Sequence, residues 1–437
     1  MSRIDQTPFP IDITDLSHDG RGVGRRDGKA VFVSGALPGE RVMAVQTRRS
    51  RAFDEGRTHA VLEASPERVT PRCPHFGTCS GCVLQHLAED KQILAKQHVL
   101  AENLERIGKV APRTWLPPLT AGSWGYRRKG RLSVRFVEKK GKTLVGFREL
   151  DPRFVADLRE CHTAVPQVGF AIEALAALID ALDGRRDIPQ VEFIVGDAAA
   201  ALTFRHLAPL SHRDYDALLA FGIAHGFAIF LQPGGTESVH RISAEPVELS
   251  FALPAHGVTF AFEPLDFIQV NATLNHAMVD HALALLDPQP DDRVLDLFAG
   301  LGNFTLPLAR RVREVVGVEG DAGLVQRARI NAGRNGLANA RFHAADLTSD
   351  LRTHTWMAEG FSKLLLDPPR SGADAVLAQL PLEQFERIVN VSCHPGSLAR
   401  DAGYLVNERG WRLEATGVMD MFPHTAHVES IALFVRR

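Results

Sequence analysis

The chain has 437 residues, of which 45% are hydrophobic and 23% are charged. This length and composition suit two or three domains with their own cores, and they exclude a disordered tail, a collagen-like repeat and a small disulfide scaffold. No stretch reaches the ~18 consecutive apolar residues that a membrane helix needs, and the first residues lack the apolar core of a signal peptide. We therefore expect a cytoplasmic protein. Nothing in the sequence indicates an obligate protein partner, and we expect a monomer.

The net charge of −2 conceals an uneven distribution along the chain. Residues 1–150 contain 26 Lys and Arg against 16 Asp and Glu, and the remainder is acidic. Within 121–148, nine Lys and Arg are interleaved with four aromatic residues and a single acid. Basic side chains pair with phosphates and aromatic rings stack on bases, so this stretch indicates a polyanionic partner, although a solvated face of a β-hairpin has the same composition.

Short predicted strands at 11–15, 30–33, 41–46 and 59–63, separated by Gly-rich or charged turns, indicate an OB-like β-barrel over residues 1–65. The apolar spacing over 84–107 predicts an amphipathic helix that ends at Gly108. Residues 66–265 then mix strands and helices, which predicts a central α+β domain. Its strands are expected at 131–137, 191–195, 200–205 and 228–231, and its helices near 167–182 and 212–225.

From residue 266 onward, short apolar strands alternate with helical stretches, as a doubly wound parallel sheet requires. The predicted strands cover 293–298, 314–319, 341–344, 363–366 and 388–392. The last two strands, 411–421 and 428–435, are joined only by a loop. An antiparallel hairpin at the end of a parallel sheet is typical of Rossmann-like class I methyltransferases, which we predict for 266–437.

The segment VLDLFAGLGNFTLPLA carries the first chemical signal. It places Asp296 at a strand end, followed by Gly300 and Gly302 in a turn that lets a ligand approach the backbone. Thr305 replaces the third glycine of a dinucleotide fingerprint. Glu319 ends the next strand, where an acid can accept hydrogen bonds from both ribose hydroxyls, so the pattern favours S-adenosylmethionine over a dinucleotide.

Two further loops at the same predicted sheet edge carry candidate catalytic groups. Asp367 begins DPPRSGA, in which two prolines stiffen the loop. Cys393 follows the fifth strand and precedes a helix that Pro395 opens, a position where the positive helix end favours a thiolate nucleophile. Asp346 ends the third strand, where it can hold the adenine end of the cofactor or simply cap a helix.

The other four cysteines form a C-x5-C-x2-C cluster, Cys73, Cys79 and Cys82, with Cys161 as a distant partner. Four thiolates from two stretches bind either an iron–sulfur cluster or a structural zinc ion. Spacing alone does not choose between them. The cysteine usage therefore predicts one metal site and one residue, Cys393, that is left for chemistry.

Taken in order, the cysteine cluster, DLFAGLGNF, DPPRSGA, SCHPGSLARD and HVES resemble the uracil-5-methyltransferases of RNA, and most of all the bacterial members that act on uridine 1939 of 23S ribosomal RNA. The resemblance covers essentially the whole chain. It implies a TRAM RNA-binding barrel over 1–65, an iron–sulfur segment and central RNA-binding domain over 66–265, and a methyltransferase domain over 266–437. One departure is His394, because the family usually has Asn after the nucleophilic cysteine.

The resemblance also implies a role for each matching residue. Cys393 would be the nucleophile and Glu429, in HVES, the base. The four clustered cysteines would ligate a 4Fe–4S cluster. The residues that would line the S-adenosylmethionine site are Gln269, Phe298, Asn303, Glu319, Asp346 and Asp367.

Three alternatives remain open from the sequence. RNA cytosine-5-methyltransferases resemble this chain but carry a second cysteine in the fourth-strand loop, and DPPRSGA has none. A different target uridine in ribosomal or transfer RNA would need the same site. A redox-responsive RNA-binding protein with an inert methyltransferase fold is the third, and an intact set of Cys393, Asp367 and Glu429 argues against it.

Overall fold

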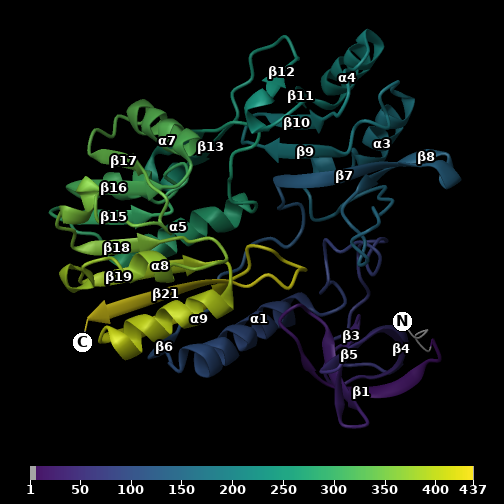
Figure 1. Ribbon diagram of the computed structural model, residues 1–437, viewed down its shortest axis with the longest axis horizontal. Coiled ribbons are helices and arrows are strands. Elements are labelled where there is room, and N and C mark those ends of the chain that lie inside the picture. The colour runs from purple at the N-terminus through teal and green to yellow at the C-terminus, as the bar shows by residue number, and fades with distance from the viewer. Residues whose placement is uncertain (1–5, 437) are drawn as a thin grey trace.

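The computed structural model describes residues 6–436, and its first five strands close into a barrel, which confirms the predicted barrel fold (Figure 1, purple). Alternate side chains, such as Val31 and Val33, point into its core. Gly24 is needed where two strands approach, because a Cβ there would lie 2.5 Å from the Asp12 carbonyl oxygen. The barrel strands are β1 (Phe9–Leu16), β2 (Gly22–Arg26), β3 (Lys29–Ser34), β4 (Arg41–Arg49) and β5 (Phe53–Glu63).

The first long helix is shorter than its apolar spacing predicts. Helix α1 spans Glu89–Asn103 and continues into a π-helical turn, η1, at Leu104–Gly108. The predicted start at Leu84 is wrong because Ala88 has an extended backbone (ψ 139°) and its N–H donates to the Glu67 carbonyl at 2.9 Å, where a helix would have it donate to the Leu84 carbonyl. A tertiary contact therefore replaces the first helical turn.

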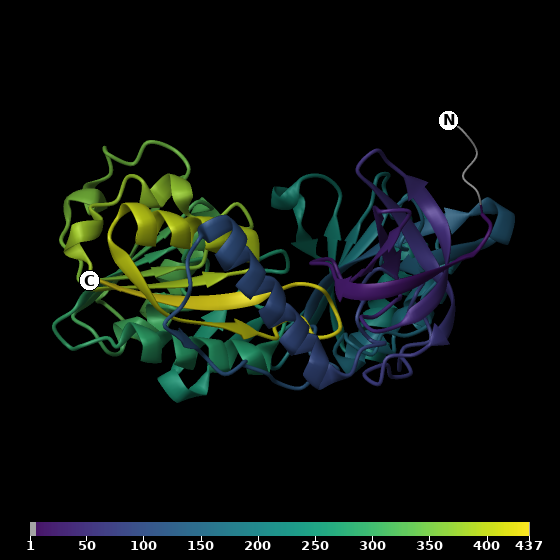
Figure 2. The same cartoon turned by 90° about the horizontal axis from the view of Figure 1, so that it is seen from below.

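Helix α1 packs on the C-terminal domain (Figure 2, blue), although it lies within the range 66–265 predicted as the middle part of the chain. It contacts α9 (Pro395–Gly403), which is drawn beside it in Figure 1, and strand β6 (Thr114–Trp115) joins the edge of the C-terminal sheet beside β20 (Trp411–Met419). The apolar side chains Ile93, Val99 and Leu100 are buried there. The chain therefore contributes a helix and a strand to the C-terminal domain before it forms the central domain.

The central domain contains a six-stranded sheet in the order β12-β11-β10-β9-β7-β8. The predicted helix over 167–182 is broken into two, because the Gly169 carbonyl leaves the helix to accept a hydrogen bond from the Cys161 N–H at 2.9 Å. The strands are β7 (Lys129–Val137), β8 (Lys142–Gly146), β9 (Gln190–Val195), β10 (Ala200–Arg205), β11 (Phe227–Gln232) and β12 (His240–Arg241). The helices are α2 (Pro166–Gly169), α3 (Ile172–Ala181) and α4 (His212–His225).

The C-terminal sheet has eight strands in the order β17-β16-β15-β18-β19-β21-β20-β6. The five strands predicted to be parallel are parallel, and β20 and β21 add antiparallel, which confirms the methyltransferase fold class. The remaining strands are β15 (Arg293–Leu297), β16 (Glu314–Glu319), β17 (Ala340–Ala344), β18 (Lys363–Leu366), β19 (Arg387–Ser392) and β21 (Glu429–Arg436). The helices are α5 (Ala272–Leu286), α6 (Thr305–Ala309), α7 (Ala322–Arg334) and α8 (Asp374–Leu377).

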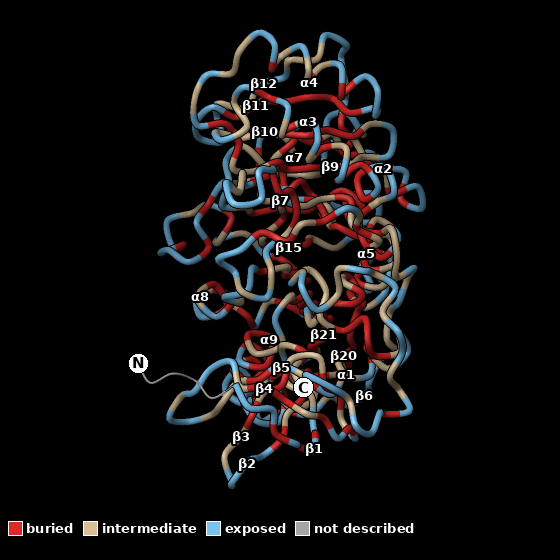
Figure 3. Tube along the Cα trace, turned by 90° about the vertical axis from the view of Figure 1, so that its right-hand side faces the viewer, coloured by how far each residue is buried: buried red, intermediate tan, exposed pale blue. Residues whose placement is uncertain are grey.

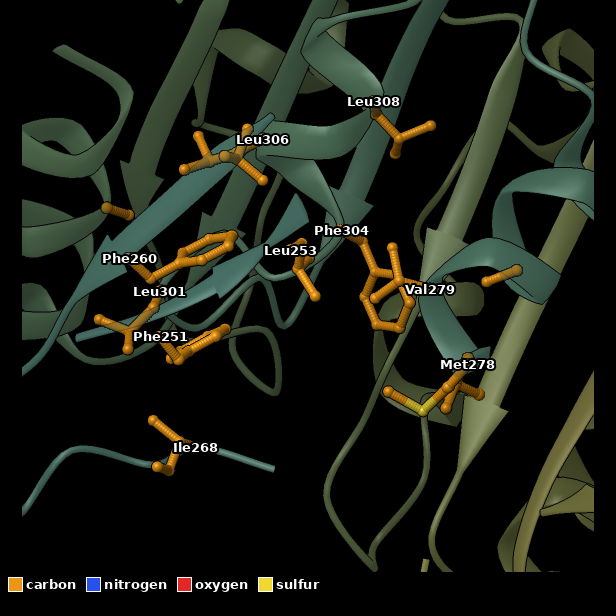
Figure 4. Packing of buried hydrophobic residues seen from close by; sticks show 14 of the residues in the cluster. Phe251, Leu253, Phe260, Ile268, Met278, Val279, Leu301, Phe304, Leu306 and Leu308 are labelled. Atoms are coloured by element: carbon orange, nitrogen blue, oxygen red, sulfur yellow. The ribbon is translucent and has the colours of Figure 1, made fainter. Parts of the chain in front are cut away.

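The largest core lies between the C-terminal sheet and a small hairpin that precedes it. Strands β13 (Ser250–Leu253) and β14 (Val258–Ala261) bury Phe251 and Phe260 beside Leu301 (Figure 4). Figure 3 shows that the buried segments follow the strands of both large sheets. Because this hairpin packs on the C-terminal core, the packing unit begins before the predicted boundary at residue 266. Among the described residues, no helix is long and apolar enough to cross a membrane.

Candidate active site and cysteine cavity

The turn after β15 adopts the backbone geometry that its glycines suggest. Gly300 and Gly302 have φ angles of 54° and 90°, and Phe298 also lies in the left-handed region at 64°. A phenylalanine held there costs of order 1–3 kcal/mol, which the surrounding structure has to offset. The Gly300 N–H donates to Glu319 at 3.0 Å, so the glycine turn and the acid of the next strand face each other.

Asp296 stabilises this turn from beneath. It is fully buried in β15, and its Oδ2 accepts a 2.5 Å hydrogen bond from the Thr305 hydroxyl. Burial raises the pKa of Asp296 to about 7, although the Thr305 hydrogen bond opposes the shift and the nearby Asp367 and Glu319 add to it. Thr305, which stands where a dinucleotide-binding protein has glycine, therefore has a defined structural partner.

Asn303 and Gln269 reach the same region from two elements. Asn303 exchanges two side-chain hydrogen bonds with the buried Asn275 of α5, at 2.9 and 3.0 Å. Gln269 is half-buried, and its carbonyl accepts a 2.8 Å hydrogen bond from Arg128 Nε. The loop that presents Gln269 is thus fixed by a side chain of the central domain.

This contact also changes the interpretation of the basic stretch 121–148. Arg128 is only 4% exposed, and Lys129 donates to the carbonyls of Leu265 and Asp266. These two side chains therefore hold the loop before α5 and are not free to contact phosphates. The composition of the stretch does not distinguish such inward-facing basic side chains from those on the surface.

Asp346 is exposed, unlike the other predicted cofactor residues. Its Oδ1 accepts hydrogen bonds from the backbone N–H and the hydroxyl of Thr348, at 2.9 and 2.7 Å. These contacts lower the pKa of Asp346 and form a local turn cap. Asp346 nevertheless follows β17 at the same sheet edge as Glu319, because the Ala345 N–H donates to the Glu319 carbonyl.

The structure brings Asp367, Cys393 and Glu429 together at the carboxyl edge of the sheet. Asp367 follows β18, which is parallel to β19, and Cys393 follows β19. In the antiparallel pair β19–β21, Ser392 faces Ser430, so Cys393 and Glu429 occupy the next position on each strand. Three residues far apart in sequence therefore meet through sheet register.

Burial and neighbouring carboxyl groups raise the pKa values of all three groups. Burial raises the pKa of Glu429 to about 8, and Asp367 adds to the shift while Lys96 and Arg370 oppose it. Burial, and next Glu319, raise the pKa of Asp367 to about 7. Burial likewise raises the pKa of Cys393 to about 11, with Glu429 and Asp367 adding to it. Burial and two carboxyl groups therefore oppose the thiolate that the helix end is expected to favour.

The loop DPPRSGA is fastened to the helix that follows Cys393. Asp401 of α9 is buried, and its Oδ2 accepts a 2.8 Å hydrogen bond from the Ala373 N–H. Arg400 donates to the Ser371 carbonyl at 2.5 Å. Gly372 has a φ of 86° and lies against both side chains, where a Cβ would be 2.3 Å from Arg400. The motif SLARD thus fixes the Asp367 loop relative to Cys393.

His394 replaces the usual Asn without losing its structural role. It is the N-cap of α9, and its Nδ1 accepts a 3.2 Å hydrogen bond from the Ser397 N–H. An Asn Oδ1 makes the same contact in many helices, and such caps contribute about 1 kcal/mol. Burial and the nearby Arg370 lower the pKa of His394, which keeps Nδ1 available as an acceptor.

The β20–β21 connection, residues 420–428, leads directly into Glu429 and contacts other parts of the chain. The Trp124 ring stacks on His424 with centroids 3.9 Å apart. The His424 carbonyl accepts hydrogen bonds from Val83 and Leu84, immediately after Cys82. Sequence reasoning did not identify this convergence, since the partners are separated by about three hundred residues and carry no shared motif.

The four remaining cysteines line one small cavity. Its walls also include Phe147, Leu158 and Gln85, and Gln85 Oε1 accepts a hydrogen bond from the Cys73 N–H at 3.1 Å. Gly81 N–H donates to Cys79 Sγ at 3.3 Å. None of the four forms a disulfide. Among the described residues, no group of three or more His, Cys, Asp or Glu is arranged to hold a single metal ion.

The parallel sheet with its terminal hairpin and the glycine turn opposite an acid define a class I methyltransferase domain joined to a small barrel. Residues 240–437 match the family described as tRNA (Uracil-5-)-methyltransferase, and residues 8–45 match the TRAM domain.

Proteins named 23S rRNA (uracil(1939)-C(5))-methyltransferase RlmD are similar over the whole chain. The one from Xanthomonas oryzae pv. oryzae (strain MAFF 311018) is 70% identical, with 100% of this chain and 99% of that protein covered. The one from Stenotrophomonas maltophilia (strain R551-3) is 69% identical with the same coverage. The chain therefore belongs to the RNA uracil-5-methyltransferase family, in the group of the RlmD enzymes, which confirms the resemblance of its motifs.

A solved structure shares the whole fold. The Pyrococcus abyssi tRNA (uracil-54, C5)-methyltransferase in complex with S-adenosyl-L-homocysteine aligns with a TM-score of 0.73, over 98% of this chain and 100% of that chain. At 23% identity this likeness shows the fold alone.

Proposed function

We propose that this protein transfers a methyl group from S-adenosylmethionine to C5 of a uridine in 23S ribosomal RNA, the position being the uridine 1939 named for its relatives. The observation that carries the proposal is the meeting of Cys393 and Glu429 at adjoining strand ends beside Asp367. Cys393 supplies the nucleophile and Glu429 supplies the base. Asp367 raises the pKa of Asp296 below the glycine turn and also the pKa values of Glu429 and Cys393, which supports a place for it between the cofactor edge and the two catalytic groups.

The chemistry assigns each group a step. Uracil C5 is a weak nucleophile, so Cys393 first loses its thiol proton to solvent. The thiolate Sγ then bonds to C6, and the C5–C6 π electrons move to form an enolate. C5 then takes the methyl group as the sulfur–methyl bond of the donor breaks. Glu429 removes the proton from C5, the C5–C6 double bond re-forms, and the bond from C6 to Sγ breaks. A carboxyl group whose pKa lies near 8 is matched to proton transfer close to neutral pH.

Six residues would hold the methyl donor. Glu319 and the Gly300 turn face each other where ribose hydroxyls would hydrogen bond, and Asn303 is oriented by Asn275. Asp346 lies at the exposed end of this edge, beside Glu319. The full set is Gln269, Phe298, Asn303, Glu319, Asp346 and Asp367.

The barrel and the outward-facing Lys and Arg side chains of the central domain would contact the RNA. A base within folded RNA must leave its stack to reach Cys393, and such flipping requires phosphate contacts around the site. Mapping 5-methyluridine in 23S ribosomal RNA from cells with and without the gene tests the proposal. We expect the modification at the target uridine to disappear without the gene and to return with a plasmid copy. Unchanged 5-methyluridine would contradict the proposal.

We also propose that Cys73, Cys79, Cys82 and Cys161 hold a 4Fe–4S cluster. Four thiols from two loops surround one cavity, a complete donor set for a cubane, and the Gly81 N–H already points to Cys79 Sγ, a contact that stabilises cluster thiolates. Four thiolates are also a complete donor set for a zinc ion, so the metal content of the purified protein distinguishes the two. The bound cluster would tie the loop after Cys73 to the central domain.

Protein purified without oxygen should be brown and contain about four irons per chain. Cys161→Ser should lose the colour and most of the iron, because it removes the only ligand from the central domain. Cys393→Ala, the matched change at the fifth cysteine, should keep both. Iron content and absorbance measure this result, and colourless protein with one bound zinc would contradict it.

A further inference from the structure

Lys96 is the one lysine of helix α1 whose ammonium group lies inside the protein. It is 2% exposed, and its Nζ donates to Asp420 Oδ1 at 2.6 Å and to the Phe422 carbonyl at 2.9 Å. Both acceptors belong to the β20–β21 connection that leads into Glu429. The neighbouring Lys91, by contrast, is partly exposed and pairs with Glu67 at 3.3 Å on the surface.

Burying an ammonium group costs free energy unless hydrogen bonds and an opposite charge compensate for the lost hydration. A methionine would fill similar space without that cost, so packing alone does not account for a lysine at this position. The two hydrogen bonds fix the ends of the short segment 420–422, and the strand pair β20–β21 transmits that position to Glu429, which faces Met419. Helix α1 thereby acts on the C-terminal site even though it precedes the central domain in sequence.

We propose that Lys96 is a positioning residue for the reaction, which holds the Glu429 strand in place through Asp420 and Phe422 and supplies a positive charge beside the base. This inference rests on the proposed role of Glu429. It predicts that Lys96 acts on the proton-removal step and not on the addition of Cys393 or on methyl transfer.

The charged groups around Glu429 predict the direction in which its pKa moves when Lys96 is replaced. Asp367 and Cys393 face it from the loops after β18 and β19, Arg370 faces it from DPPRSGA, and Lys96 faces it from α1. Asp420 neutralises part of the Lys96 charge. Lys96 also acts on His424 and His427 of the same connection. The Lys96 charge favours the ionised form of Glu429, so its loss shifts the acid limb of proton removal to higher pH.

The experiment measures the rate at which the covalent protein–RNA adduct resolves in a single turnover, from about pH 6 to about pH 9, with methyl-labelled donor and a 23S ribosomal RNA fragment. Lys96→Met should shift the acid limb up by about one pH unit and slow resolution about tenfold at neutral pH. Adduct formation should remain near the wild-type rate. Lys96→Arg should restore the profile, and Lys91→Met, on the same helix, should leave it unchanged.

Asp420→Asn provides the decisive comparison, because it loosens the same segment but removes the negative charge of the Lys96–Asp420 pair, where Lys96→Met removes the positive one. The acid limb should then shift to lower pH, opposite to Lys96→Met. Shifts in the same direction, or an unshifted limb in both variants, would overturn the inference and leave Lys96 with a packing role. If Lys96→Met does not fold, Asp420→Asn and Lys96→Arg still give this answer. Wild-type protein that forms no 5-methyluridine would instead contradict the proposed function.

Discussion

Replacing Cys393 with alanine should lower methyl transfer by at least about a thousandfold, since no other group in the site can add to C6. Cys393 is half-buried between Asp367 and Glu429, and the described part of the chain has its other cysteines in the distant cavity. The variant should still bind S-adenosylmethionine and RNA, because the side chains assigned to those ligands are untouched. Transfer of labelled methyl groups to RNA measures the loss.

A second readout distinguishes a missing nucleophile from a damaged site. RNA that contains 5-fluorouridine at the target should trap the wild-type protein covalently, because fluorine cannot be removed from C5 as a proton. Cys393→Ala should form no adduct, and Cys393→Ser should form little, since a hydroxyl is a much weaker nucleophile. Thermal unfolding close to that of the wild type serves as the folding control. Appreciable turnover by Cys393→Ala would show that the nucleophile assignment is wrong.

The high pKa of Cys393 bears on when the thiolate forms. In the isolated protein, burial and the adjacent carboxyl groups raise the pKa of the thiol, whereas Arg370 and a backbone hydrogen bond oppose them. A positively charged methyl donor placed next to Asp367 would neutralise one of these carboxylates. We therefore expect the thiol to ionise more readily when the donor is bound.

Local patterns in the sequence predicted the parallel sheet, its terminal hairpin and the barrel, because alternating and continuous apolar runs report burial directly. The glycine turn and Cys393 could be assigned a place because strand ends meet at one sheet edge. Glu429 was different: its role came only from the HVES resemblance, and register with β19 is what places it beside Cys393.

The contacts that the sequence did not predict are those made between distant segments. Arg128 and Lys96 lie in a basic stretch and an amphipathic helix, patterns that indicate a surface, yet both are buried against backbone carbonyls. The helix over 84–107 was predicted too long because the Ala88 N–H binds the Glu67 carbonyl and not the carbonyl one helical turn earlier. Contacts of this kind depend on which distant segment the fold brings near, and the local hydrophobic periodicity of the sequence does not encode that neighbour.

Glu429→Gln should stall the reaction after methyl transfer, so that a methylated protein–RNA adduct accumulates. Addition of Cys393 and methyl transfer precede loss of the C5 proton and do not use Glu429, whereas elimination of Cys393 does. Glutamine keeps the shape of the side chain but cannot accept the C5 proton, and loss of a general base typically slows such a step by about a hundredfold to ten-thousandfold. Denaturing electrophoresis with methyl-labelled donor should therefore show a labelled, slowly migrating band.

The pH dependence of the wild type gives an independent test of the same base. Glu429 must be ionised to act, and its pKa near 8 means that resolution of the adduct should accelerate as the pH rises from about 6 to about 8 and then level off. The Gln variant has no such group, so its residual resolution should not show this acid limb. Glu383→Gln, a change at an exposed glutamate on the protein surface, should match the wild type in both rate and profile. Release of 5-methyluridine by Glu429→Gln at near wild-type rate, with the acid limb intact, would show that another group removes the proton and that Glu429 only supports the strand.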